Sequence, residues 1–301
     1  YREYKGTGGK RRKIQEGKDM SIRIMTDSTS DIGPERAREW GITLVPLKVI
    51  FGKDEYLDGV DLPLDAFYEK LQASKQLPTT SQPAPEMFLR EFEAARDAGD
   101  QVVLLTISSE LSGTYQSACL AREMCGYDGI YIVDSRQVTC TILLMARRAL
   151  ALAKEGKTAA EIAAVLEEEK RHYCIYAVIG DLTYLEKGGR LPKAGAVAGS
   201  ILNLRPLITI ANTGVVKLAG MARGQSGAYG KLLKMLEADG GQDMSREFCL
   251  GYTGGIDVLQ PFQEYISQRM NMDKCLVSRV GTVIGTHGGP GCAVFGAYVA
   301  D

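Results

Sequence analysis

The fold of this chain is indicated first by one short stretch, Val102-Val103-Leu104-Leu105-Thr106-Ile107-Ser108-Ser109-Glu110-Leu111-Ser112-Gly113-Thr114. Its first half is a run of branched apolar residues, which is typical of a buried β-strand. Its second half is rich in hydroxyl groups and leads into a helical pattern that begins near Tyr115. A buried strand, a loop and a helix in this order form the repeating unit of a parallel sheet covered by helices.

The same alternation extends outward on both sides of this stretch. Further strands are predicted at Ile22 to Met25, Thr43 to Ile50 and Ile130 to Val133. Amphipathic helices are predicted between them, and the one at Pro85 to Ala98 has a proline at its first position, where helices tolerate it. We therefore expect residues 20–156 to form an N-terminal α/β domain with a Rossmann-like parallel sheet.

The second half of the chain predicts a mixed α/β domain over residues 157–301. Two helical patterns, Thr139 to Lys154 and Thr158 to Lys170, are expected to carry the chain across the domain boundary, and the second opens with a capping box. Strand patterns then follow at Cys174 to Ile179, Leu207 to Ala211, Val215 to Leu218, Phe248 to Tyr252, Leu276 to Thr282 and Ala293 to Val299. Asn212-Thr213-Gly214 predicts a hairpin turn, so part of this sheet should be antiparallel.

The composition is that of an ordinary globular protein with room for two cores. The chain has 301 residues, which exceeds the length at which one hydrophobic core usually stops growing. Hydrophobic residues make up 45%, charged residues 24%, and the formal net charge is -1, so no overall field would attract nucleic acid. Seven cysteines without a C-x-x-C pair argue against a disulfide framework and against a structural zinc site.

The first residues differ from the rest of the chain. Residues 1–19 carry Lys10-Arg11-Arg12-Lys13 amid glycines and lack apolar periodicity, so we expect a basic tail or leader outside the two domains. The pattern of a secretory signal peptide is missing. The sequence contains no run of about 18 apolar residues, which a membrane-spanning helix would need. These features favour a cytoplasmic location.

Hydroxyl-rich loops that follow strands are the first candidates for a binding site, because ligands of parallel sheets bind beyond the carboxyl ends of the strands. Ser112, Gly113 and Thr114 precede a helix, where free N–H groups and the helix dipole favour an anion. The same residues can instead cap the helix, and the two roles can coexist. A second hydroxyl cluster is Thr79-Thr80-Ser81-Gln82.

A histidine among glycines is a further candidate. The strand at Leu276 to Thr282 is predicted to run into a turn, Gly281 to Gly291, that contains His287. Core packing explains such a histidine poorly, so we expect it to contact a ligand. The segment Asp181 to Arg190 adds two cations and two glycines, and arginine suits carboxylate or phosphate recognition. The alternative for this segment is a solvated loop after a short helix.

Five motifs together resemble the DegV family, in the order in which that family carries them. They are Met25-Thr26-Asp27-Ser28-Thr29-Ser30-Asp31, Thr80-Ser81-Gln82-Pro83, Leu111-Ser112-Gly113-Thr114-Tyr115-Gln116-Ser117-Ala118, Leu185-Glu186-Lys187-Gly188-Gly189-Arg190 and Thr286-His287-Gly288-Gly289-Pro290-Gly291. The resemblance spans essentially residues 20–301. Each motif alone is weak, but all five in order are specific.

The resemblance implies two α/β domains with a long-chain fatty acid between them. The family includes the binding subunits of bacterial fatty acid kinase, which present the fatty acid to a separate ATP-using subunit that phosphorylates its carboxylate. By this resemblance Thr80 and Ser112 would hydrogen-bond the carboxylate, His287 would lie beside it, and the N–H groups of Gly113 and Thr114 would assist. Hydroxyl and N–H donors could hold the carboxylate without a neutralising arginine, which would leave it accessible for phosphoryl transfer.

The resemblance also implies how such a carrier is used. It assigns Arg190 and Arg223 to docking of the kinase subunit. The chain departs from the pattern after Arg223, where members that serve a kinase often continue with basic residues and this chain reads Gly224-Gln225-Ser226-Gly227-Ala228. The protein itself would be a carrier and not an enzyme, with no cofactor or metal, no nucleic acid partner and at most transient contact with a membrane surface.

Two other classes of function stay open at this stage. One is an enzyme that acts on a small anionic or phosphorylated metabolite at the same interdomain site, with Asp27, Ser112 and His287 as candidate catalytic groups. Neither a metal-ligand cluster nor a recognisable Ser/His/Asp motif supports it. The other is a purely regulatory or interaction protein. A lipid that copurifies with the protein would favour the carrier.

Overall fold

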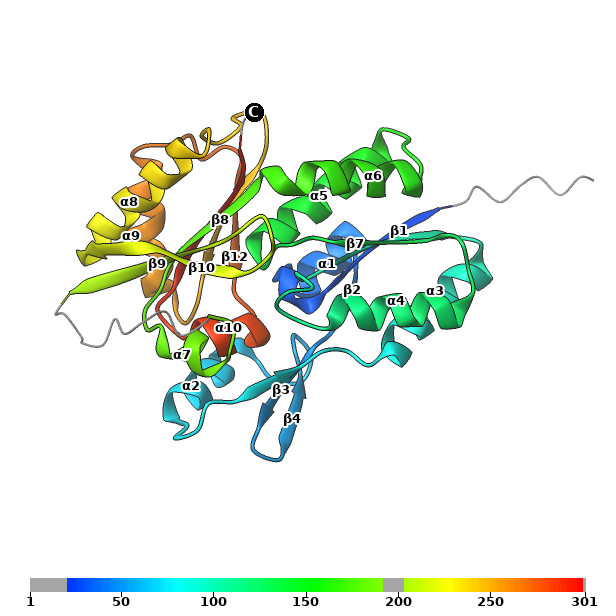
Figure 1. Cartoon of the computed structure of the whole chain (residues 1–301), viewed down its shortest axis with the longest axis horizontal. Helices are drawn as coiled ribbons and strands as arrows, with labels where there is room; N and C mark the ends of the chain where they lie inside the picture. The colour runs from blue at the N-terminus through cyan, green and yellow to red at the C-terminus, as the bar shows by residue number, and fades with distance from the viewer. Residues whose placement is uncertain (1–20, 192–202, 300–301) are drawn as a thin grey trace, which may run out of the picture.

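The computed structural model describes residues 21–191 and 203–299, and in these ranges the chain forms three sheets surrounded by helices (Figure 1). The first sheet has four parallel strands in the order β2-β1-β6-β7. The strands are β1 (Ile22–Asp27), β2 (Thr43–Val45), β6 (Gln101–Thr106) and β7 (Ile130–Asp134). The parallel sheet predicted for the first half of the chain is confirmed.

Helices cover both faces of this parallel sheet. They are α1 (Pro34–Trp40), α3 (Pro85–Ala98), α4 (Thr114–Cys125), α5 (Cys140–Lys154) and α6 (Ala159–Glu169). Val102 and Leu104 of β6 pack with α3 and α4, whereas Val103 and Leu105 pack on the other side with α5 and α6. Because β6 is buried on both faces, its sequence is an unbroken apolar run.

The second sheet has six strands in the order β10-β9-β8-β13-β11-β12. They are β8 (Tyr173–Val178), β9 (Leu204–Ile210), β10 (Val216–Arg223), β11 (Phe248–Tyr252), β12 (Cys275–Arg279) and β13 (Ala293–Tyr298). Only β11 and β12 pair in parallel, so the predicted mixed sheet is confirmed. Helices α8 (Gly224–Ala238) and α9 (Ile256–Ser267) cover one face of this sheet (Figure 1).

A third, small sheet was not predicted. The segment Thr43 to Ile50, expected to be one strand, divides at Pro46 into β2 and β3 (Lys48–Phe51). Proline has no N–H for a ladder bond, so the chain leaves the parallel sheet there. β3 then pairs antiparallel with β4 (Asp54–Leu57) and with β5 (Thr79–Ser81), which the sequence analysis took for a loop.

The expected turn around His287 is a helix. β12 ends at Arg279, three residues earlier than predicted, and α10 (Thr282–Gly288) follows. The carboxylate of Asp58 accepts hydrogen bonds from the N–H and the hydroxyl of Thr282, at 2.9 and 2.7 Å. A distant residue therefore caps the first turn of α10, which is why the local glycine pattern misled the prediction. Two other short helices lie nearby, α2 (Leu64–Ala73) and α7 (Thr183–Lys187).

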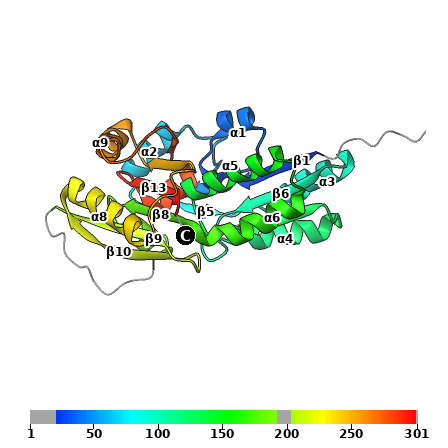
Figure 2. The ribbon, with the colours of Figure 1, turned by 90° about the horizontal axis from the view of Figure 1, so that it is seen from above.

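Helix α5 joins the two large sheets into one core. It packs against β1 and β6 of the parallel sheet and against β8, β11 and β13 of the mixed sheet, whereas α6 packs against β6 and β7 (Figure 2). The domain boundary after residue 156 stays a prediction.

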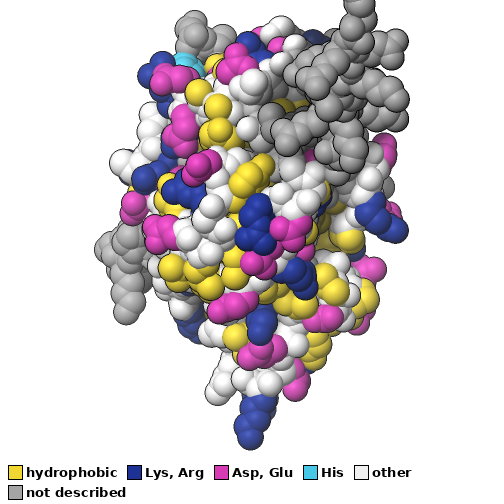
Figure 3. Space-filling view, turned by 90° about the vertical axis from the view of Figure 1, so that its right-hand side faces the viewer, with side chains coloured by type: hydrophobic (Ala, Val, Ile, Leu, Met, Phe, Trp, Pro, Cys, Tyr) yellow, Lys and Arg dark blue, Asp and Glu magenta, His cyan; other side chains and the backbone are white. Residues whose placement is uncertain are grey.

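On the face shown in Figure 3, basic and acidic side chains are interspersed, and this face shows no extended patch of one charge.

Candidate functional site

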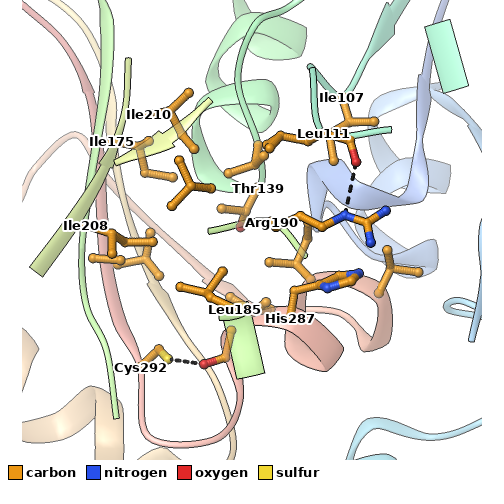
Figure 4. Close-up of a pocket in the computed structure, with 18 of the residues that line it drawn as sticks. Ile107, Leu111, Thr139, Ile175, Leu185, Arg190, Ile208, Ile210, His287 and Cys292 are labelled. Carbon is orange, nitrogen blue, oxygen red and sulfur yellow. Dashed lines mark hydrogen bonds between the residues drawn. The ribbon is translucent and has the colours of Figure 1, made fainter. Parts of the chain in front are cut away.

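A cavity lies where the carboxyl ends of β6 and β7 meet the open face of the mixed sheet (Figure 4). The empty space among its lining atoms, mouth included, is about 830 Å³. Its walls are mainly aliphatic. The mixed sheet contributes Ile175, Ala177, Ile208, Ile210, Val216 and Val294, and the loops after β6 and β7 contribute Ile107, Leu111 and Val138.

Strand alternation explains why one side of the mixed sheet is lined this way. In β8, Ile175 and Ala177 point into the cavity, whereas Tyr176 and Val178 point to the opposite face and pack with α8 and α9. Successive side chains of a strand point to opposite faces. The aliphatic wall of the cavity is therefore one face of an ordinary two-sided core strand, at a place that α5 does not fill.

The hollow exists because small residues stand at the centre of this sheet. Ala177 lies opposite Ile208 of β9 and Val294 of β13, so it is the small member of a cross-strand row. A neighbouring small residue, Gly296, is covered by α5, since a Cβ built there would lie 2.9 Å from the Cβ of Cys140. The space above Ala177 has no such cover in the described structure and forms part of the cavity.

One end of the cavity is polar. Thr80 from β5 and His287 from the last turn of α10 both line it, and Thr80 Oγ1 lies 2.9 Å from His287 Nε2. Nδ1 of His287 is buried and has no hydrogen-bond partner among the residues described; it lies against Gly188, where any Cβ would overlap it. Burial, and then the nearby charge of Arg190, lower the pKa of His287 to about 4. The imidazole is therefore neutral at pH 7.

Ser112 lies in the loop that precedes α4 and also lines the cavity. Its Oγ is 2.8 Å from Oγ1 of Thr114, the first residue of α4. Gly113 lies between them, and the end of the Gln82 side chain packs over it, where a Cβ would overlap that side chain. The structure thus brings Thr80, Ser112 and His287 to one cavity, with Gly113 and Thr114 directly behind Ser112.

The two arginines singled out in the sequence lie in different surroundings. Arg190 is partly buried and lines the cavity; its Nε donates to the carbonyl oxygen of Leu111 at 3.2 Å and its Nη1 to that of Gly188 at 2.7 Å. Burial lowers the pKa of Arg190. Arg223, at the end of β10, is exposed and does not line the cavity.

Asp27 does not join this site. It is fully buried, accepts from the N–H groups of Thr29 and Ile107 at 2.9 and 2.7 Å, and does not line the cavity. Burial raises the pKa of Asp27 to about 6. The three candidate catalytic groups of the enzyme alternative are therefore not assembled. Within residues 21–191 and 203–299, no cluster of three or more His, Cys, Asp or Glu side chains is arranged to hold a metal ion.

The residues that line the apolar part of the cavity could not be identified from the sequence. The signal was the alternation in β8 and β9, which places Ile175, Ala177, Ile208 and Ile210 on one face. It could not be used, because only the fold shows which face a helix leaves uncovered.

In the described part of the chain, no helix is both long and apolar enough to cross a membrane.

Comparisons with known proteins place these observations in a family. The sequence model of the DegV family, described as uncharacterised proteins, matches residues 21–299. A DegV domain-containing protein of Caldanaerobacter subterraneus is 33% identical over 272 residues, which cover 90% of this chain and 96% of that protein. Among solved structures, a fatty-acid-binding DegV family protein from Thermus thermophilus is 33% identical with a TM-score of 0.84, covering 93% of this chain and 100% of that one. The fatty acid kinase B3 protein of Streptococcus pneumoniae, loaded with linoleic acid, shares the fold at 22% identity and a TM-score of 0.81, covering 93% of this chain and 100% of that one.

Proposed function

This chain belongs to the DegV family, and from that membership and the geometry of its cavity we propose that it binds one long-chain fatty acid and carries it as a ligand. The observation that carries the proposal is a mainly aliphatic cavity in which Thr80, Ser112 and His287 gather at one end. This distribution matches a molecule with a long apolar tail and a single polar head group.

The apolar walls would supply most of the affinity. Burial of each methylene group is worth roughly 0.8 kcal/mol, so a sixteen-carbon tail gains on the order of 10 kcal/mol before ordering costs. The walls offer this tail aliphatic side chains from both halves of the molecule. The head group then determines the orientation of the fatty acid in the cavity.

We assign the carboxylate to the polar end, beside Thr80, Ser112 and His287. The two hydroxyl groups can donate hydrogen bonds to it, and the neutral imidazole can fix the orientation of Thr80 through their shared hydrogen bond. The N–H groups of Gly113 and Thr114 lie next to Ser112 and can assist. This assignment agrees with the roles that the family resemblance implies.

The finer proposal is that the bound fatty acid is presented to a separate kinase subunit, which makes the acyl phosphate. It is supported by the family motifs and by the shared fold of the fatty acid kinase B3 protein of Streptococcus pneumoniae. The exposed Arg223 is available for docking, whereas Arg190 also lines the cavity. In this proposal the chain is a carrier and performs no chemistry itself.

The decisive experiment is denaturing extraction of the purified protein, followed by mass spectrometry of fatty acids quantified against protein. We expect close to one acyl chain per polypeptide. Absence of lipid, together with no thermal shift when fatty acids are added, would overturn the proposal in favour of the small-anion enzyme. Addition of ATP and a fatty acid kinase subunit should then yield acyl phosphate; failure of that step alone removes only the kinase partnership.

Two matched variants test the head-group assignment. Ser112→Ala removes a hydroxyl group that lines the cavity, whereas Ser81→Ala removes one from β5 that does not line it. We expect weaker fatty acid binding for the first variant and unchanged binding for the second. Equal affinity of Ser112→Ala and the parent protein would exclude the proposed role of Ser112.

A further inference from the structure

Two buried carboxyl groups, those of Asp31 and Asp58, meet at the start of α10. Asp31 follows the short helical turn after β1 and is 6% exposed, and Asp58 follows β4 and is 5% exposed. Oδ1 of Asp31 accepts a hydrogen bond from the N–H of Gly281, and Oδ1 of Asp58 accepts one from the N–H of Thr282, each at 2.9 Å. Because these two N–H groups are consecutive in the chain, the two carboxyl groups are neighbours. We call them the aspartate pair.

The packing around Gly281 shows how closely the aspartate pair converges. A Cβ built on Gly281 would lie 2.8 Å from Oδ1 of Asp31, and 3.1 and 3.3 Å from the two carboxyl oxygens of Asp58. Both acidic groups therefore approach the same point of the backbone. Like charges that share a site in this way cannot both ionise cheaply.

The second oxygen of each carboxyl group has no donor. Oδ2 of Asp31 and Oδ2 of Asp58 are buried, and neither has a hydrogen-bond partner among the residues that the structure describes. Burial of an ionised carboxylate is costly unless a positive charge or hydrogen-bond donors compensate it. A proton on one group would supply the missing donor to the other.

Two cations border the aspartate pair, but both are engaged elsewhere. Arg38 of α1 and Arg279 of β12 line a surface hollow that the pair also lines. Nε of Arg38 donates to the carbonyl oxygen of Pro34 at 3.4 Å, and Arg279 forms an ion pair with Asp65 at 2.6 Å. Within residues 21–191 and 203–299, the pair has no ion-pair partner. A further titratable neighbour, Tyr68 of α2, donates its O–H to a backbone carbonyl at 3.0 Å and is neutral, because burial raises its pKa.

The surroundings favour the protonated form. Burial raises the pKa of both Asp31 and Asp58. The nearby hydroxyl of Thr139 and the hydrogen bonds from Thr282 lower these pKa values in part, whereas the charges of Asp58 and Asp27 raise that of Asp31 further. The pair therefore keeps a proton at a pH where an exposed aspartate has lost it.

We propose that Asp31 and Asp58 share one proton at neutral pH and that this proton joins α10 to the first half of the chain. The O–H of one carboxyl group donates to an oxygen of the other, so both buried Oδ2 atoms gain a partner. Val283, Ile284 and His287 of α10 line the cavity, so the shared proton supports one of its walls. When the proton leaves to solvent, two facing carboxylates repel each other at the start of α10.

The test is the unfolding constant as a function of pH for the lipid-free parent and for Asp58→Asn, whose amide can donate a hydrogen bond but cannot ionise. Since the folded pKa is raised, the contribution of the pair is fully present below about pH 4 and is lost as the pH rises through the raised pKa. We expect the ratio of the parent's unfolding constant to that of Asp58→Asn to rise about tenfold per pH unit in this window, because the folded parent holds one extra proton. Asp54→Asn is the matched control, since Asp54 lies exposed at the other end of β4, and its ratio should stay constant.

Two further measurements locate the proton. The infrared spectrum of the folded parent at pH 7 should contain the carbonyl band of a protonated carboxyl group, and Asp58→Asn should lack it. Amide hydrogen exchange at equal pH should show α10 increasingly better protected in Asp58→Asn than in the parent as the pH rises.

Three outcomes would overturn the inference. A ratio of unfolding constants that does not change with pH would mean that both carboxyl groups are ionised throughout. Stabilisation of the parent, but not of Asp58→Asn, by added Mg²⁺ or Ca²⁺ at pH 7 would mean that a metal ion neutralises the pair instead. Absence of the infrared band from the parent refutes the shared proton even if the asparagine variant does not fold.

Discussion

The size of one small side chain, Ala177, should determine how far an acyl tail can extend. Ala177 is 6% exposed and lies in β8 between Ile208 and Val294, in a row of three cavity-lining residues. Ala177→Leu adds three carbon atoms to the floor of the cavity without adding a polar group. The change therefore fills space that we assign to the tail.

The expected magnitude follows from the displaced methylene groups. If three of them lose their place, the loss is about 2.4 kcal/mol at roughly 0.8 kcal/mol each, or about 50-fold in affinity. In the parent protein each added methylene should improve affinity about fourfold. In the leucine variant this gain should stop once the tail reaches residue 177. The lipid-free variant should unfold no more easily than the parent, because the new side chain fills an apolar hollow.

The assay is affinity against chain length, measured for saturated acids from eight to eighteen carbons, with a thermal melt of each lipid-free protein. Ala73→Leu is the control, because Ala73 is exposed at the end of α2 and receives the same three carbon atoms. A leucine variant at residue 177 that keeps the parent's gain per methylene would show that the tail does not pass this strand.

Three further predictions concern the core and the polar end. Gly296→Ala should lower the free energy of unfolding by about 1–3 kcal/mol in denaturant titration, because its Cβ would press on Cys140; an unchanged midpoint would contradict the close packing of α5. Thr80→Val should weaken fatty acid binding roughly tenfold or more, since a hydroxyl donor to a charged group is lost; calorimetry with equal affinity for both proteins would exclude this donor. The contribution of His287 to stability should be fully present above about pH 6.5 and should fall by up to about 3 kcal/mol as the pH drops towards 4, because only the unfolded chain binds the proton in this range. The difference in unfolding free energy between the parent and His287→Gln measures it, and a difference that does not depend on pH would refute the low pKa.

Local sequence patterns predicted the parts of the fold that depend on local chemistry. The apolar runs of β6 and β7 predict two strands of the parallel sheet, and the capping box at Thr158 starts α6, as the structure shows. The polar residues Thr80, Ser112 and His287 were singled out because hydroxyl groups and a histidine among glycines are unusual after strands. All three line the cavity.

What the sequence could not show depends on contacts between distant segments. The start of α10 is capped by Asp58, which lies 224 residues from Thr282 along the chain. Arg190 lies in the cavity because it bonds to Leu111, 79 residues away. Neither contact leaves a local pattern, so α10 was taken for a turn, and the sequence did not show that Arg190 lines the same cavity as Leu111.

The core that α5 shares between the two sheets has a hollow where an acyl tail would lie. Loaded and empty forms should therefore differ in stability, since a ligand at about 100 times its dissociation constant adds roughly 2.7 kcal/mol. Chaperones and proteases act on the unfolded fraction, which would be larger for the empty form. The amount of this protein in a cell would then follow the supply of fatty acids, without any change in its synthesis.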